Sequence, residues 1–174
     1  KITGLVLTGG EPLLQRDVAS FLSDVKARGV DVKLDTNGYH PDSLSALISA
    51  ELVDYVAMDV KAPFAKYPLL AGLEELDMGR IQASVALLSQ GRVPWEFRTT
   101  VVPGLLDAGD VEQIARWLAD QSDPARTPYV LQQFRGSQTL SRALSDVAPY
   151  PSDVMRDIVG RVRRWLPLVT VRGV

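Results

Sequence analysis

The sequence predicts an α/β fold in which parallel strands alternate with helices and curve into an open, partial (β/α) barrel. The first observation is that short runs rich in Val, Leu and aromatic residues alternate with longer amphipathic stretches, as in βα units. The second is that several strands have one apolar and one polar face, such as Val32 and Leu34 against Lys33 and Asp35. Helices over the apolar faces would leave the polar faces toward a hydrated interior. An antiparallel sheet with one wet face is the alternative.

Turn residues bound most of the expected strands, and helical patterns lie between them. Strands are expected over Ile2–Thr8, Val30–Thr36, Tyr55–Val60, Trp95–Val102, Tyr129–Phe134 and Leu168–Val171. Helices are expected over Leu13–Arg28, Asp42–Glu51, Met78–Ser89, Asp110–Gln121 and Ser152–Trp165. The first helix has Leu14, Val18, Phe21, Leu22 and Val25 on one stripe, and Asp110 and Ser152 are candidate caps. The 174 residues are expected to form a single domain.

The composition excludes several classes of function. Lys and Arg number 19 and Asp and Glu 21, a net charge of −2, which gives no global attraction to nucleic acid or to an anionic membrane. No apolar run has the roughly 18 residues of a membrane span, so a cytoplasmic protein is expected. The chain contains no cysteine. Disulfides, thiol nucleophiles and an iron–sulfur cluster held by its own thiolates are therefore excluded.

The carboxyl ends of parallel strands, where such folds bind ligands, are polar in this sequence. The first end reads Thr8-Gly9-Gly10-Glu11-Pro12. Two glycines let a ligand approach the backbone closely. Glu11 could accept hydrogen bonds from a ligand ammonium. The alternative is a tight turn with an acidic residue at the start of a helix.

The second strand end, Asp35-Thr36-Asn37-Gly38, offers Asp35 on the polar face, with an Asx-turn as the structural alternative. At the third, Asp59 and Lys61 lie two residues apart on one face. Lys61 could hold a ligand carboxylate, or the two could be a structural ion pair. Two further ends, 96–104 and 131–136, are also polar. Five polar ends meeting at one mouth favour a functional site over chance.

Taken in order, these motifs resemble those of radical S-adenosylmethionine (SAM) enzymes that activate glycyl radical enzymes, above all the anaerobic ribonucleoside-triphosphate reductase activating proteins. The resemblance covers nearly the whole chain. It implies a six-stranded partial barrel of the TIM type in an anaerobic oxidoreductase. In that family a 4Fe-4S cluster on a C-x-x-x-C-x-x-C loop binds SAM, and reductive cleavage gives a 5′-deoxyadenosyl radical. The radical generates a glycyl radical on a partner enzyme, with flavodoxin or ferredoxin as the expected electron donor.

The resemblance also implies a set of site residues. The implied SAM contacts are Gly9, Gly10, Glu11, Asp35, Thr36, Asp59, Lys61, Thr100 and Arg135. Gly9, Gly10 and Glu11 would meet the SAM amino group, and Lys61 the SAM carboxylate. In related activases the two aspartates can hold a monovalent cation, which implies such a site at Asp35 and Asp59. No catalytic residue is assigned.

The sequence departs from the family in having no cluster motif, since it has no cysteine. We expect that the family's first strand and cluster loop are missing, and that the chain is the C-terminal, SAM-side part of a longer activase and is inactive alone. One alternative is another (β/α)-barrel enzyme that uses Asp59 and Lys61. An orotidine-monophosphate-decarboxylase type would need a further aspartate where Phe64 stands, and an aldolase type would need Lys61 as a Schiff base. The other alternative is a catalytically inert fragment.

Overall fold

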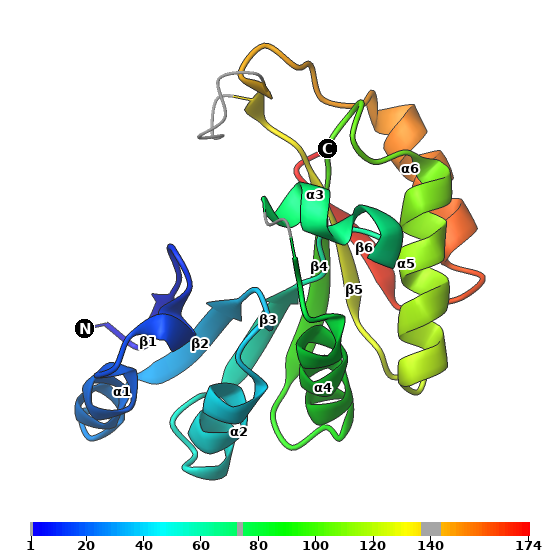
Figure 1. The fold of residues 1–174 in the computed structure, drawn as a ribbon. Helices are drawn as coiled ribbons and strands as arrows, with labels where there is room; N and C mark the ends of the chain where they lie inside the picture. The colour runs from blue at the N-terminus through cyan, green and yellow to red at the C-terminus, as the bar shows by residue number, and fades with distance from the viewer. Residues whose placement is uncertain (1, 73–74, 137–143) are drawn as a thin grey trace. The chain divides into compact units, whose positions relative to one another are not determined.

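Six strands and the helices between them alternate along the chain, as the sequence pattern predicts (Figure 1). The computed structural model describes residues 2–72, 75–136 and 144–174. The strands are β1 (Gly4–Leu7), β2 (Asp31–Thr36), β3 (Tyr55–Asp59), β4 (Trp95–Val101), β5 (Tyr129–Gln133) and β6 (Val169–Arg172). They lie in one sheet in chain order, and the pairs β1–β2, β2–β3 and β5–β6 are parallel. The α/β fold is confirmed, and the antiparallel alternative is wrong.

The helices follow the strands at the expected places. They are α1 (Val18–Lys26), α2 (Pro41–Ser49), α3 (Tyr67–Ala71), α4 (Met78–Ser89), α5 (Ala108–Gln121) and α6 (Ser152–Val162), with short 3-10 turns η1 (Pro12–Leu14) and η2 (Phe64–Lys66). Helix α4 has the predicted bounds. The turn η2 and the five-residue α3 were not predicted, because segments so short show no helical periodicity.

The first predicted helix begins too early. Pro12 starts a 3-10 turn that ends at Gln15, whose backbone is extended (φ −76°, ψ 125°), and α1 begins only at Val18. Leu14 and Phe21 are consequently exposed, and Leu22 is the buried residue of α1. The predicted apolar stripe is therefore wrong in its extent, since the proline-led turn interrupts the helical period.

Two predicted helix caps are also wrong. Asp107, not Asp110, is the N-cap of α5: its carboxylate accepts a hydrogen bond from the Asp110 backbone N–H, and the Asp110 carboxylate accepts one from the Asp107 N–H. This reciprocal pair is a capping box, and it places Asp110 at the third helical position. Pro151 precedes α6, so Ser152 is its first helical residue and not its cap.

The chain divides into two units, Lys1–Val60 with Asp77–Phe97 and Lys61–Leu76 with Arg98–Val174. In the first unit α1, α2 and α4 lie on the same side of the strands (Figure 1). The apolar faces of β2 and β3 are buried as predicted, with Val32, Leu34, Val56 and Met58 at most 1% exposed. In the second unit α5 packs beside α6, and α6 contacts β6. The single-domain expectation stays a prediction.

The polar face of β4 is more buried than the sequence predicts. Glu96 and Arg98, on β4, are 2% and 8% exposed. In the first unit Tyr55 donates a hydrogen bond to Glu96, and the Lys33 ammonium lies 3.5 Å from it. The charged side chains thus cover one another, because a buried charge is stable only when it is paired. Among residues 2–72, 75–136 and 144–174, no helix is long and apolar enough to cross a membrane.

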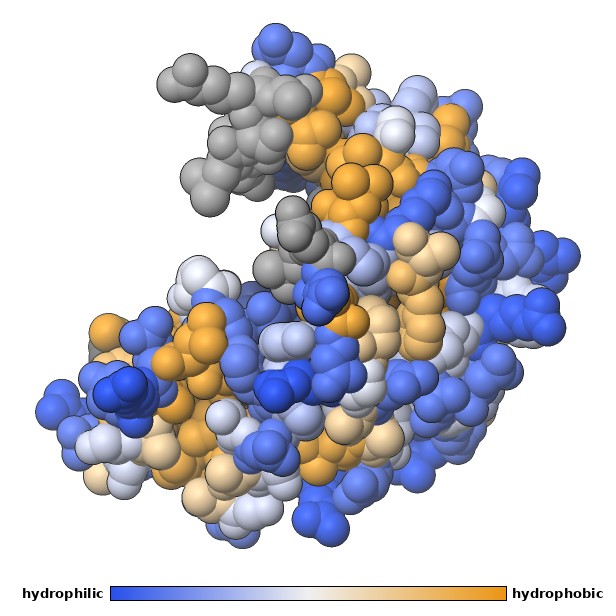
Figure 2. All heavy atoms as spheres, viewed as in Figure 1, coloured by the Kyte–Doolittle hydropathy of each residue, from blue (hydrophilic) through white to orange (hydrophobic). Residues whose placement is uncertain are grey.

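Hydrophobic residues also reach the surface, and Figure 2 shows them among hydrophilic ones. The large exposed ones are Ile2, Val6, Leu14, Phe21, Phe64, Leu69, Leu168 and Val174. Scattered exposed apolar residues are normal for a folded protein.

Candidate functional site

The loop after β1 contains two glycines, whose backbone is not covered by side chains of their own. Gly9 and Gly10 have φ of 90° and 55°, in the left-handed region that favours glycine. A β-carbon built on either residue would meet no other atom within 4 Å, so the space over both is open. A polar ligand can therefore reach the peptide groups of this loop.

Glu11, the next residue, is turned inward and is 7% exposed. Its carboxylate accepts hydrogen bonds from the Leu13 backbone N–H (3.2 Å), the Thr36 hydroxyl (2.8 Å) and the Asn37 N–H (2.7 Å). A carboxylate has about four acceptor positions, so most of its capacity is used within the chain. The structure thus ties the loops after β1 and β2 together through one buried carboxylate.

The loop after β2 is held by contacts of its own. The Thr36 hydroxyl accepts from the Gly38 N–H (3.1 Å), and the Asn37 side chain accepts from the Tyr39 N–H (2.9 Å). The second contact is the Asx-turn considered from the sequence. Gly38 has φ of 74°, and a β-carbon there would meet the end of the Met58 side chain. Thr36, Asn37 and Gly38 therefore have structural roles.

Asp35, which precedes them, belongs to a group of charged residues in the first unit. The Lys33 ammonium lies 3.8 Å from an Asp35 carboxylate oxygen and 3.5 Å from one of Glu96. Lys33 and Asp35 share a face of β2 because they are two residues apart. Asp59 is at the end of β3, also in the first unit, and is half-buried.

The second unit contains a cavity of about 1060 Å³ that brings together three predicted site residues, Lys61, Thr100 and Arg135. Its other lining residues are Leu69, Leu70, Ala71, Gly72, Val102, Leu105, Gln132, Gln133, Phe134 and Leu144. The Thr100 hydroxyl lies 3.4 Å from the Gln132 side-chain oxygen. Sequence reasoning missed the wall made by Leu69–Gly72, since nothing in that segment signals a ligand.

Lys66 anchors this wall. Its ammonium donates to the Asp110 carboxylate (2.6 Å) and to the Leu105 carbonyl (3.4 Å), which ties the turn before α3 to the start of α5. The hydrogen bond to Asp110 raises the pKa of Lys66, and burial opposes it. Lys66 is therefore charged at neutral pH and holds the segment against α5.

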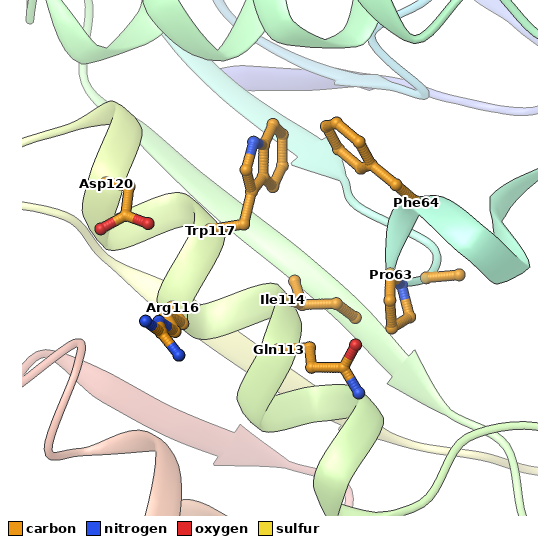
Figure 3. Close-up of a pocket in the computed structure, with 8 residues that line it drawn as sticks. Pro63, Phe64, Gln113, Ile114, Arg116, Trp117 and Asp120 are labelled. Carbon is orange, nitrogen blue, oxygen red and sulfur yellow. The ribbon is translucent and has the colours of Figure 1, made fainter.

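A smaller cavity of about 270 Å³ lies between the segment that leads into η2 and helix α5, also in the second unit (Figure 3). The Phe64 and Trp117 rings lie side by side there, with centroids 4.9 Å apart. None of the predicted site residues lines it.

In the second unit, the exposed Lys61 in a partly apolar cavity is chemically suited to a ligand carboxylate such as that of SAM. In the first unit, the open Gly9-Gly10 backbone is chemically suited to a polar group such as an ammonium. The residues of this chain do not fit an iron–sulfur cluster, since no thiolate is present in the 174 residues. In the part of the chain that the structure describes, no three His, Asp or Glu side chains are close enough together to hold a metal ion.

Two solved structures have the same fold as this chain. A domain of pyruvate-formate lyase-activating enzyme from Bacteroides vulgatus superposes with a TM-score of 0.76 over 98% of this chain and 99% of that one, at 15% identity. A structure of TYW1 with a lysine–pyruvate adduct gives a TM-score of 0.69 over 93% of this chain and 50% of that one, at 14% identity. At these identities the similarity shows the fold alone.

The sequence comparisons identify the family. The model of the radical SAM superfamily matches residues 1–118, so the chain belongs to that superfamily, whose enzymes use SAM and a 4Fe-4S cluster. A Methanocaldococcus jannaschii protein named a glycyl-radical enzyme activating enzyme is 32% identical over 98% of this chain. A second protein of that organism with the same name is 27% identical over 75% of it. The chain spans 70% of the first relative's length and 51% of the second's.

A further relative is not named as an activating enzyme. A 7-carboxy-7-deazaguanine synthase of Methanospirillum hungatei is 30% identical over 75% of this chain, which spans 57% of that protein. Membership of the radical SAM superfamily removes the basis for the decarboxylase and aldolase alternatives, since the matched residues include Asp59 and Lys61.

Proposed function

We propose that this protein is the SAM-binding portion of a radical SAM activase that installs a glycyl radical on a partner enzyme of the anaerobic ribonucleotide reductase type. The observation that carries the proposal is the cavity lined by Lys61, Thr100 and Arg135 in a chain that matches an activating-enzyme relative over 98% of its length. The expected electron donor is flavodoxin or ferredoxin, and the expected location is the cytoplasm.

In this proposal, residues at the strand ends recognise the charged groups of SAM. The Lys61 ammonium binds the SAM carboxylate, with Thr100 and Arg135 in the same cavity. The SAM ammonium meets the exposed peptide groups of Gly9 and Gly10. Glu11 acts through that loop, because its carboxylate already accepts three hydrogen bonds from the chain. The remaining proposed SAM contacts are at the ends of β2 and β3, namely Asp35, Thr36 and Asp59.

When SAM is bound beside a reduced 4Fe-4S cluster, it supplies the 5′-deoxyadenosyl radical of the family's chemistry. The residues of this chain hold and orient SAM through its two charged ends. Opposite charges on one amino-acid group fix its direction as well as its affinity.

Titration of SAM into Lys61→Ala and Lys61→Met tests the binding role. A hydrogen bond to a charged group contributes about 1.5–3 kcal/mol, so both variants should bind SAM roughly 10- to 150-fold more weakly, at about 1.4 kcal/mol per decade. Lys26→Met is the matched control, since the Lys26 ammonium bonds to Asp54 in the first unit. An unchanged dissociation constant in both Lys61 variants, with normal thermal melts, would rule out the ligand role.

The activase reaction needs a protein that joins this sequence to a cysteine-bearing cluster loop. Incubated anaerobically with SAM, a reductant and an anaerobic ribonucleotide reductase, it should produce the EPR doublet of a glycyl radical. The 7-carboxy-7-deazaguanine synthase relative supports a second candidate, the synthesis of that heterocycle. Formation of 7-carboxy-7-deazaguanine, with no glycyl radical signal, would replace the first proposal by the second.

A further inference from the structure

In the group formed by Lys33, Asp35 and Glu96, one ammonium lies beside two carboxylates. We propose that Lys33 is a positioning residue for Asp35. The Lys33 ammonium supplies the positive charge beside the Asp35 carboxylate, and this charge makes SAM binding independent of an alkali-metal cation. The inference rests on the proposed SAM site, in which Asp35 is a contact. It is an alternative to a monovalent cation at Asp35 and Asp59.

The Lys33 ammonium is held from several sides within the first unit. It lies 3.8 Å from Asp35 and 3.5 Å from Glu96, and 5.4 Å from the centre of the Tyr55 ring. Tyr55 donates its hydroxyl hydrogen to the other oxygen of Glu96 (3.1 Å). The Glu96 side chain is only 3% exposed. A buried carboxylate needs a charged partner, so Glu96 holds Lys33 near Asp35.

The position of Lys33 follows from the sheet. Lys33 and Asp35 point to the same face of β2, and Lys33 is opposite Tyr55 in the parallel register of β2 with β3. The Lys33 ammonium lies 3.8 Å from the Asp35 carboxylate, so an alkali cation bound to that carboxylate would be repelled by the positive charge already beside it. The residues around Asp35 therefore fit an internal ammonium better than a bound cation.

SAM affinity in two buffers of equal ionic strength, one with choline chloride and one with potassium chloride, tests this proposal. The informative variant is the double substitution Lys33→Met with Glu96→Gln. It removes the ammonium together with the Glu96 charge that faces it, and the amide oxygen of the introduced glutamine can still accept from Tyr55. Lys33→Arg keeps the charge, and Lys26→Met removes a lysine that is paired with Asp54.

The wild type, Lys33→Arg and Lys26→Met should bind SAM equally well in both buffers. The double variant should bind about tenfold more weakly in choline, the equivalent of about 1.4 kcal/mol, and should recover in potassium. Potassium-dependent binding by the wild type would overturn the proposal, and so would wild-type affinity of the double variant in choline.

Thermal melts without SAM separate this inference from the proposed function. Potassium should raise the melting temperature of the double variant and leave that of the wild type unchanged. If the wild type binds SAM in neither buffer, the SAM-site proposal fails for this chain while the melts still test the role of Lys33. Stabilisation by potassium in both proteins, or in neither, would refute that role.

Discussion

Glu11→Gln is the most informative single change in the loops. The Glu11 carboxylate accepts from Leu13, Thr36 and Asn37 with two oxygens. Glutamine has one oxygen and one NH2 group, so in either orientation at least one backbone N–H faces another donor. The loss of one bond to a charged acceptor, with a buried N–H left unpaired, costs about 2–3 kcal/mol. For a chain of this length that lowers the melting temperature by about 4–10 °C.

Urea unfolding followed by both circular dichroism and tryptophan fluorescence measures this free energy, and coincident curves establish that unfolding is two-state. Thr36→Val removes the hydroxyl that donates to Glu11. A double-mutant cycle of the two substitutions should give a coupling energy of about 1 kcal/mol, because the residues are in direct contact. Glu51→Gln, at an exposed glutamate, is the matched control and should remain within about 0.5 kcal/mol of the wild type.

The opposite result would mean that Glu11 faces the ligand and does not hold the loop. In that case Glu11→Gln would unfold at the wild-type urea concentration and bind SAM much more weakly. If Glu11 holds the loop, the main effect of Glu11→Gln is a lower free energy of unfolding. SAM affinity then falls only as far as the Gly9-Gly10 backbone moves.

Three further substitutions test local features. Gly38→Ala should lower the free energy of unfolding by about 1–2 kcal/mol in urea titrations, because its φ of 74° strains a residue with a β-carbon and the end of the Met58 side chain must move aside. An unchanged free energy of unfolding would contradict this role of Gly38. Burial acts to raise the pKa of Asp54, but hydrogen bonds and the charge of Lys26 lower it overall. Its carboxylate therefore stabilises the fold above the unfolded-state pKa and loses this effect as the pH falls below about 4. Urea midpoints of Asp54→Asn should fall less steeply than those of the wild type in that range, and equal slopes would refute the assignment. Glu51→Gly should raise the free energy of unfolding by about 0.5–1 kcal/mol, since Glu51 is exposed and has φ of 55°. A lower melting temperature would show that its side chain has an unrecognised role.

The sequence alone determined the order of strands and helices and the faces of β2 and β3. Period-two alternation over Asp31–Thr36 and the helical period over Met78–Ser89 are local properties of the backbone, and the structure confirms both. The order of the motifs at the strand ends was equally visible, and it led to the radical SAM superfamily that the comparisons show. Where a proline-led turn interrupted the period, as at Pro12, the same reasoning failed.

Only the tertiary structure decided what each polar side chain contacts. The alternatives for Glu11, a ligand contact or a turn, could not be separated from sequence, because its partners Thr36 and Asn37 follow a complete helix and strand. The pairing of Lys33 with Glu96 depends on the crossovers that bring β2, β3 and β4 together in order. A local pattern encodes which face of a strand is polar, whereas the identity of a partner across the sheet is set by register and chain topology.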